Sequence, residues 1–273
     1  MDYPELTMAD CLRPAWSVSP RVHALVTTRA GGVSEPPYGR LSDGVPQPGG
    51  LNLGLHTGDE AVRVEENRTR LLKLAGVRAA WLEQVHGDRI VRAEEALAQT
   101  APLRADASVS ASPGVACIVM VADCMPVLFA DEAGRAVGAA HAGWRGLAAG
   151  VIEKTAAQVA ARAGTSIGAL HAYLGPAIGP RAFEVGEDVR ETFMAQAPGN
   201  EKQSTSGAFT PHAEVRGKYW ADLYALARLR LARHGVVRVT GGDVCTVTER
   251  ERFYSYRRDG TTGRMAAMVW LAQ

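Results

Sequence analysis

Residues 115–146 have the sequence VACIVMVADCMPVLFADEAGRAVGAAHAGWRG, and this stretch decides the fold. Its first part, Val115 to Ala122, is apolar without interruption and predicts a buried strand. The run from Val127 to Ala130 predicts a second strand, Asp131 to Arg135 a turn, and Arg135 to Ala140 the returning strand. The sequence therefore predicts a β-hairpin that follows a buried strand.

The open end of this hairpin carries two side chains that bind metals or move protons. If the turn is centred near Ala133, Cys124 and His141 lie almost opposite each other. The Cβ atoms of such a cross-strand pair are about 4.5–5.5 Å apart. A thiol and an imidazole at that distance can share a metal ion or a proton.

A third candidate ligand lies upstream of the hairpin. The run from Trp81 to Val85 predicts a strand, and His86 to Asp88 predicts the turn after it. If this turn meets the hairpin, His86, Cys124 and His141 converge. Three imidazole and thiolate ligands with a fourth position open are typical of a catalytic zinc site, because structural zinc sites normally have four protein ligands.

These residues belong to a set of motifs spread over most of the chain. The chain resembles the YfiH/YlmD laccase-domain family, also described as the purine nucleoside phosphorylase or peptidoglycan editing factor family. The motifs that carry the resemblance are Thr28–Ser34, Asn52–Gly54, Gly58–Asp59, Gln84–His86, Ala122–Val127, Ala140–Gly146, Leu174–Pro180 and Phe253–Gly260. By this resemblance, His86, Cys124 and His141 are the zinc ligands.

The resemblance also implies the substrates, which are purine nucleosides and phosphate. It implies phosphorolysis of adenosine, inosine and methylthioadenosine, and deamination of adenosine to inosine. Zinc chemistry permits both, because the ion lowers the pKa of bound water to about 7 and polarises leaving groups. In phosphorolysis the transition state is cationic at the anomeric carbon, so a phosphate held nearby is both nucleophile and electrostatic stabiliser.

Four further assignments concern side chains around the predicted metal. Asp123, beside the thiolate, is a candidate to orient a ribose hydroxyl or to shuttle a proton, with capping of the strand end as the alternative. Arg145 follows His141 by four residues, near the start of a predicted helix, and its guanidinium suits phosphate oxygens. Arg29 and Asn52 lie beside glycines that let backbone approach a ligand, and the resemblance supports both as substrate-binding residues. The predicted catalytic residues are thus Asp123, Cys124 and Arg145.

Two other classes of function fit the same residues. The first alternative is an amidase that acts on cell-wall precursors or peptides. In it Cys124 is the nucleophile and His141 its base, and Asp123 or His86 orients that base. A binding module with a purely structural zinc is the non-enzymatic alternative, which a three-ligand set disfavours.

The histidine inventory argues against a multicopper laccase. The chain has seven histidines and no His-x-His pair, whereas a trinuclear copper cluster needs many closely spaced imidazoles. Copper remains possible in the predicted zinc site, and with it a polyphenol oxidase, because a His/Cys site binds copper more tightly than zinc.

Composition limits the class of protein and its partners. The 273 residues are 47% hydrophobic with a net charge of +1, which predicts one globular domain over residues 1–273 and gives no electrostatic case for nucleic acid. Four cysteines are too few and too scattered for a disulfide framework. The N-terminal segment Met1 to Glu5 lacks the pattern of a secretory signal, and no apolar run approaches the roughly 20 residues that span a bilayer. We expect a cytoplasmic protein without a membrane partner.

The irregular alternation of predicted strands and helices along the chain predicts an α/β fold, with a mixed β-sheet in an α/β/α layered arrangement. The segment from Gln196 to Pro211 is polar and predicts a mobile loop. Asp106 is predicted to cap a turn, with a place in the pocket lining as the alternative. His56 is predicted to be a structural histidine, with a place near the pocket as the alternative. The predicted strands are Arg21–Thr28, Ala169–Leu174, Val236–Val239 and Met265–Trp270, and the predicted helices are Asp59–Ala75, Leu147–Ala163, Glu187–Ala195 and Ala221–Ala232.

Overall fold

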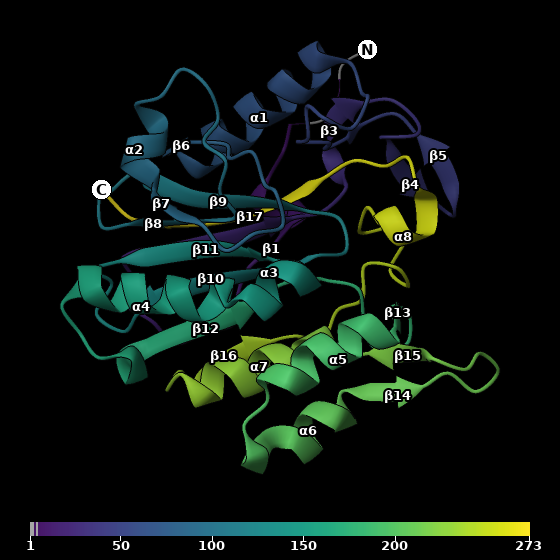
Figure 1. The fold of residues 1–273 in the computed structure, drawn as a ribbon. Helices are drawn as coiled ribbons and strands as arrows, with labels where there is room; N and C mark the ends of the chain where they lie inside the picture. Colours follow the sequence, from purple (N-terminus) through teal and green to yellow (C-terminus); the bar gives the residue numbers. More distant parts are fainter. Residues whose placement is uncertain (1–2, 4) are drawn as a thin grey trace.

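The computed structural model describes residues 3 and 5–273, and its strands form two main sheets that pack face to face (Figure 1). Met1, Asp2 and Pro4, part of the segment weighed above as a possible secretory signal, lie outside the described residues. In spatial order the five-stranded sheet contains β1 (Cys11–Leu12), β2 (Val22–Thr27), β17 (Met265–Leu271), β9 (Val115–Val121) and β6 (Arg78–Ala79). The six-stranded sheet contains β16 (Arg238–Gly241), β12 (Leu170–Leu174), β10 (Met125–Asp131), β11 (Val137–Ala142), β8 (Ala107–Ser110) and β7 (Ile90–Arg92).

Alternating side chains of the central strands supply two different cores. In β9, Cys117 and Val119 point between the sheets, whereas Ile118 points to the outer face. In β10, Leu128 points between the sheets and Phe129 points outward. Successive side chains of a strand face opposite sides of its sheet, so a strand with both faces covered is apolar throughout. This explains the unbroken apolar runs.

Helices cover the outer face of each sheet. Leu71 of α1 packs on the five-stranded sheet, and Val159 of α4 and Leu231 of α7 belong to the core on the outer side of the six-stranded sheet. The helices are α1 (Ala61–Ala75), α2 (Ala93–Leu97), α3 (Trp144–Ala149), α4 (Val151–Ala163), α5 (Glu187–Gln196), α6 (Lys202–Gly207), α7 (Leu223–Arg233) and α8 (Tyr256–Asp259). No helix in the described ranges combines the length and the apolar character that crossing a membrane requires.

The predicted mixed α/β fold is confirmed, with one more layer than expected. Parallel pairs, such as β12 with β16, occur beside antiparallel pairs, such as β10 with β11. The strands are divided between two sheets because the chain leaves the first sheet after Val121 and enters the second at Met125. Smaller sheets are formed by β13 (Glu184–Gly186), β15 (Lys218–Ala221) and β14 (Phe209–Pro211), and by β4 (Arg40–Ser42) and β5 (Val45–Gln47), while β3 spans Ala30–Ser34.

Three local predictions are corrected. Trp81 to Val85 is not a strand, since only Glu83 forms an isolated bridge, with Arg104. The helix predicted over Leu147–Ala163 starts earlier and is divided, because Gly150 adopts a left-handed conformation (φ 90°) between α3 and α4. The predicted loop from Gln196 to Pro211 contains α6 and β14 and buries Thr205.

The other predicted elements are present with shifts of a few residues at their ends. The corresponding observed elements are β2, β12, β16, β17, α1, α5 and α7. The hairpin is also present, but its last pair is Met125 with Ala142, and Pro126 is the residue opposite His141. Cys124 therefore lies just beyond the paired residues, on the segment that passes between the sheets.

Candidate metal centre and its cavity

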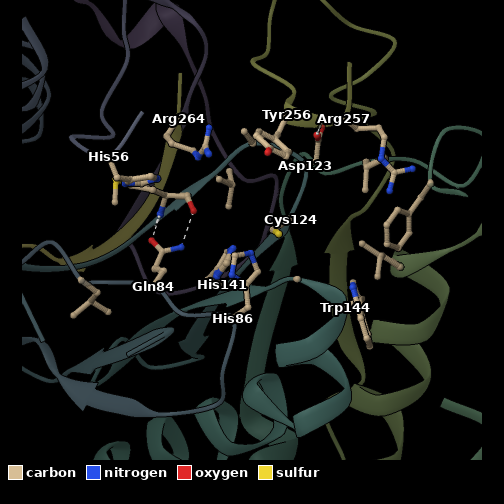
Figure 2. A pocket seen from close by; sticks show the side chains of 18 of the residues that line it. His56, Gln84, His86, Asp123, Cys124, His141, Trp144, Tyr256, Arg257 and Arg264 are labelled. Carbon is tan, nitrogen blue, oxygen red and sulfur yellow. Dashed lines mark hydrogen bonds between the residues drawn. The ribbon is translucent and has the colours of Figure 1, made fainter. Parts of the chain in front are cut away.

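The structure brings the three predicted ligands together. One ligand atom each from His86, Cys124 and His141 lies within 4.8 Å of the other two. The two imidazole rings are 4.8 Å apart at their centroids and are inclined by 69°. His141 comes from β11, Cys124 from the segment between the sheets, and His86 from a bend after α1 and β6 (Figure 2).

Asp106 fixes His141 from behind. Its carboxylate lies 2.8 Å from Nδ1 of His141, and its backbone carbonyl accepts a hydrogen bond from the His141 amide at 2.7 Å. Hydrogen bonds from His141 and from backbone amides outweigh burial and lower the pKa of Asp106, so the carboxylate is ionised and accepts the proton of Nδ1. This bond leaves Nε2 of His141 as the ligand atom, the arrangement typical of metal-binding histidines.

The same carboxylate also shapes the bend that carries His86. It accepts hydrogen bonds from the backbone amides of Val85, His86 and Gly87 at 3.2, 2.9 and 2.7 Å. His86 has φ 61°, a conformation that residues with a side chain rarely adopt. The predicted turn-capping role of Asp106 is therefore confirmed, but this residue also orients two of the three candidate ligands, which the sequence did not indicate.

Gly143 allows the ligands to approach each other. A Cβ atom at this position would lie 2.8 Å from Sγ of Cys124 and 3.1 Å from Cδ2 of His86. Contacts this short would push both ligands away. The glycine in the motif His141-Ala142-Gly143 is thus required by the packing of the site.

Opposite charges are favoured on Cys124 and His141. Burial raises the pKa of Cys124, but the charge of His141 and hydrogen bonds from both histidines lower it to about 6. Burial lowers the pKa of His141, whereas the charges of Cys124 and Asp106 and their hydrogen bonds raise it to about 9. A metal cation bound by the same atoms would replace the proton, because metals bind thiolate and neutral imidazole.

The triad opens into a cavity of about 600 Å³. Ile178, Phe183 and Leu223 belong to one apolar cluster, with Trp144 packed against it, and all four line this cavity. His56, Gln84 and Arg264 lie on the other side of the triad from Trp144 (Figure 2). The aromatic side chains of Trp144 and Phe183 thus lie at one end of the cavity, where Arg257 lies 5.5 Å from the Phe183 ring centre, and polar groups of His56, Gln84 and Arg264 lie at the other end.

Asp123 lines the cavity, but its carboxylate is occupied by hydrogen bonds to neighbouring residues. The carboxylate accepts hydrogen bonds from Thr246 Oγ1 at 2.6 Å, Ser255 Oγ at 3.0 Å and the Arg257 amide at 2.7 Å. Its backbone has φ 87°, which turns the chain between the two sheets. This geometry matches the structural alternative considered for Asp123.

The three other predicted site residues do not line the cavity. Arg29 is buried and donates to the carbonyls of Gly39 and Arg250. Asn52 is fully buried and bonds Thr57, Asp59 and backbone amides. Arg145 is exposed, with its guanidinium 4.4 Å from the centre of the Trp144 ring.

Arg264, Tyr256 and Phe183 line the cavity and were missed as site residues. Tyr256 and Arg257 lie in a motif that the resemblance did mark, so that motif was the available signal. His56, predicted to be structural, also lines the cavity. Arg264 and Phe183 had no sequence signal, since a single Arg or Phe in a folded chain indicates no site.

The described residues form a mixed α/β protein with a candidate three-ligand His/Cys metal centre. Within the described part of the chain, His86, Cys124 and His141 are the only group of three or more such side chains positioned to hold a metal ion. The chain belongs to the family described as multi-copper polyphenol oxidoreductase laccase, whose model matches residues 23–272. Since one three-ligand site cannot hold a trinuclear copper cluster, the described residues do not support the multicopper part of that description.

Relatives in this family are similar to the chain over nearly its whole length. It is 50% identical to purine nucleoside phosphorylase PA4543 of Pseudomonas aeruginosa over 260 residues, which cover 95% of this chain and 98% of that protein. It is 49% identical to purine nucleoside phosphorylase YfiH of Escherichia coli over 266 residues, covering 97% and 100%. The crystal structure of Neisseria meningitidis protein NMB0706 superposes with a TM-score of 0.85 at 46% identity, covering 97% and 100%. The predicted resemblance to the YfiH/YlmD family is thereby confirmed.

Proposed function

We propose that this protein is a metal-dependent purine nucleoside phosphorylase that acts on adenosine, inosine and methylthioadenosine and also deaminates adenosine. The observation that carries the proposal is the convergence of His86, Cys124 and His141 at a cavity of about 600 Å³. This volume lies in the range of about 300–1,000 Å³ typical of small-molecule sites. Relatives that match nearly the whole chain bear the name of this activity, which supports one catalytic domain over residues 1–273.

The donor set fits zinc, and copper as well. Two imidazole nitrogens and a thiolate are ligands that both metals accept, and three protein ligands leave a position open, as in catalytic zinc sites. The metal would act there as a Lewis acid that polarises oxygen or nitrogen atoms and lowers the pKa of water. We propose zinc as the native metal.

The two ends of the cavity suit the two parts of a nucleoside reaction. Trp144 and Phe183 offer apolar, aromatic surface to a purine ring at one end. At the other end a phosphate oxygen would form the bond to the anomeric carbon while the bond to the purine breaks. The purine leaves with the electron pair of that bond and takes up the proton of hydrogen phosphate, so ribose 1-phosphate and free base are the products.

Product analysis tests the proposal. The metal-loaded protein is incubated with adenosine, with and without phosphate, and adenine is resolved from inosine. We expect adenine and ribose 1-phosphate only when phosphate is present, and inosine under both conditions. Unchanged adenosine under both conditions, with the metal present, would contradict the proposal.

A cysteine-nucleophile amidase is the second candidate, and one observation favours it. Cys124, His141 and Asp106 are arranged as nucleophile, base and orienting carboxylate, with the pKa of Cys124 lowered to about 6. Asp106 takes the orienting role that the sequence assigned to Asp123 or His86. This candidate requires a metal-free active protein that iodoacetamide inactivates, whereas the phosphorylase loses its activity when a chelator removes the metal. A role in peptidoglycan editing depends on the same test.

A further inference from the structure

We propose that Arg264 binds the phosphate in the cavity. This inference rests on the proposed phosphorylase function and names the residue that recognises the second substrate. It replaces Arg145 and Arg29, which were predicted for this role and do not line the cavity.

Two nitrogen atoms of the Arg264 guanidinium are not engaged by the part of the chain that the structure describes. Nη1 donates to the carbonyls of Thr262 and Gly263 at 3.2 and 3.0 Å. Neither Nε nor Nη2 of Arg264 has a hydrogen-bond partner among the described residues. No carboxylate of a described residue lies within 4.0 Å of the Arg264 guanidinium. Two donors in a fixed fork match two oxygens of one phosphate.

Arg264 differs in this respect from two other arginines, the buried Arg29 and the partly buried Arg68. Arg29 uses Nε, Nη1 and Nη2 on backbone carbonyls. Arg68 donates to the Leu53 carbonyl and to Met120 Sδ and stacks on Trp81, with 4.1 Å between its guanidinium and the ring centre. Neither of them lines the cavity, whereas Arg264 does (Figure 2). Arg257 also lines the cavity, but its guanidinium lies 5.5 Å from the centre of the Phe183 ring, at the end where the purine is placed, and its Nη1 donates to the Glu184 carbonyl. A buried cation without a carboxylate is costly unless an anion joins it.

The backbone around Arg264 is held by the motif Asn52-Leu53-Gly54. Oδ1 of the fully buried Asn52 accepts the Arg264 amide at 2.9 Å, and the Leu53 amide donates to the Arg264 carbonyl at 3.1 Å. A Cβ atom on Gly54 would lie 2.8 Å from Cγ of Arg264, so only glycine leaves room for the arginine stem. This motif therefore builds the position of Arg264, which gives Asn52 an indirect part in the site.

The electrostatic surroundings favour an anion at this end of the cavity. The pKa of His56 is lowered by desolvation and by the positive charges of Arg264 and Arg68. The pKa of Arg264 is lowered by burial, an effect opposed by Cys124 and Asp123. Glu83, which also lines the cavity, directs its carboxylate to Arg104 at 3.3 Å. A phosphate beside Arg264 would therefore meet the positive charges of Arg264 and Arg68, with the triad between it and Trp144.

Direct binding of inorganic phosphate tests this inference separately from catalysis. Calorimetric titration with phosphate is performed on the metal-loaded wild type, Arg264→Gln, Arg264→Lys, Arg145→Gln and Arg238→Gln. Arg238 is a matched control because its charge is paired with Glu132. Glu132 lies in the turn of the hairpin, and Cys124 and His141 lie at the other end of the hairpin. Losing a bidentate, charge-assisted contact should raise the phosphate Kd at least about tenfold in Arg264→Gln.

The variants separate loss of phosphate recognition from loss of structure. Arg264→Lys keeps the charge without the fork, so its Kd should lie between those of wild type and Arg264→Gln. Arg238→Gln should match the wild type, and all variants should retain their metal and circular dichroism spectrum. The inference is overturned if Arg264→Gln binds phosphate as well as the wild type, if the wild type binds none, or if Arg145→Gln alone loses the binding. Phosphate binding that depends on Arg264 without release of purine would uphold the inference and contradict only the proposed function.

Discussion

Asp106 and Asp123 are two buried carboxylates next to the candidate metal ligands, and they have different tasks. Asp106 bonds the side chain of His141 and the backbone that carries His86. Asp123 bonds Thr246, Ser255 and the Arg257 amide, all of them in the C-terminal part of the chain at or near α8. Asp106 therefore orients candidate metal ligands, and Asp123 stabilises the C-terminal residues beside the cavity.

This difference shows that position next to a ligand in the sequence does not predict a chemical role. Asp123 is the direct neighbour of Cys124, yet its oxygens are occupied by structural donors. Asp106 is remote from His86 and His141 along the chain but contacts both. Measurements on the metal-free protein and on variants of each carboxylate test this distinction.

The largest expected effect is on the acidity of Cys124. In metal-free protein its pKa should lie near 6 instead of 9.0, because the protonated His141 held by Asp106 stabilises the thiolate. The alkylation rate of Cys124 by iodoacetamide, followed on its peptide by mass spectrometry, should therefore show a midpoint near pH 6. Cys11 and Cys117, whose pKa values are raised to about 12 by burial, should stay unreactive. A midpoint near 9 for Cys124 would contradict the arrangement.

The two pKa shifts also determine how the stability of the metal-free protein depends on pH. The lowered pKa of Cys124 contributes stability that is fully present above pH 9.0 and is lost as the pH falls through about 6. The raised pKa of His141 contributes stability that is present below pH 6.5 and is lost as the pH rises through about 9. Because the contribution of Cys124 grows over the same pH range in which that of His141 declines, the two nearly cancel, so stability from this pair should rise slightly near pH 6 and change little at higher pH. Thermal unfolding across this range, compared between metal-free and metal-loaded protein, measures this dependence.

The second prediction is a loss of metal affinity in Asp106→Asn. Each carboxylate oxygen of Asp106 accepts from two N–H groups, so the amide nitrogen of Asn would face two donors in either orientation. Loss of such a supporting partner typically weakens metal binding by about 10–100-fold. Competition with a chromophoric zinc chelator measures the effect. An Asp106→Asn variant with wild-type metal affinity would mean that Asp106 does not orient the ligands.

The third and smallest effect is expected for Asp123→Asn, which serves as the matched comparison. The amide nitrogen would leave the Arg257 N–H or the Thr246 hydroxyl with a poorer partner, at a cost of about 1–3 kcal/mol in the free energy of unfolding. Metal affinity should stay at the wild-type value because the ligands keep their support from Asp106. Denaturant unfolding and the same chelator competition measure the two quantities. If Asp123→Asn lost the metal as Asp106→Asn does, the two carboxylates would have one function instead of two.

The sequence was sufficient for the hairpin and for the ligand triad. Alternating and continuous apolar runs define β9, β10 and β11, and the ligand types at their ends indicate a metal. The division into two sheets could not be predicted, because a strand buried on both faces is apolar whether helices or a second sheet cover it. The break at Ala122 to Cys124 carries no turn signal that distinguishes a hairpin within one sheet from a passage between two.

The residues missed by the sequence have properties that exist only in three dimensions. Arg264 is unusual because two of its donors have no partner in the described chain, and partners cannot be counted from a sequence. Arg29 has the same side chain beside a glycine motif, but backbone carbonyls occupy its donors. The sequence predicted that Asn52, in the motif Asn52-Leu53-Gly54, binds substrate, whereas in the structure Asn52 supports Arg264 and does not line the cavity.

The metal content of wild type and Cys124→Ala, measured with nucleoside turnover on the same samples, tests the central claim most directly. We expect about one zinc ion per wild-type chain, since the triad is one three-ligand site. Cys124→Ala should contain none and convert no adenosine. A Cys124→Ala protein that keeps its zinc and the wild-type rates would contradict the account.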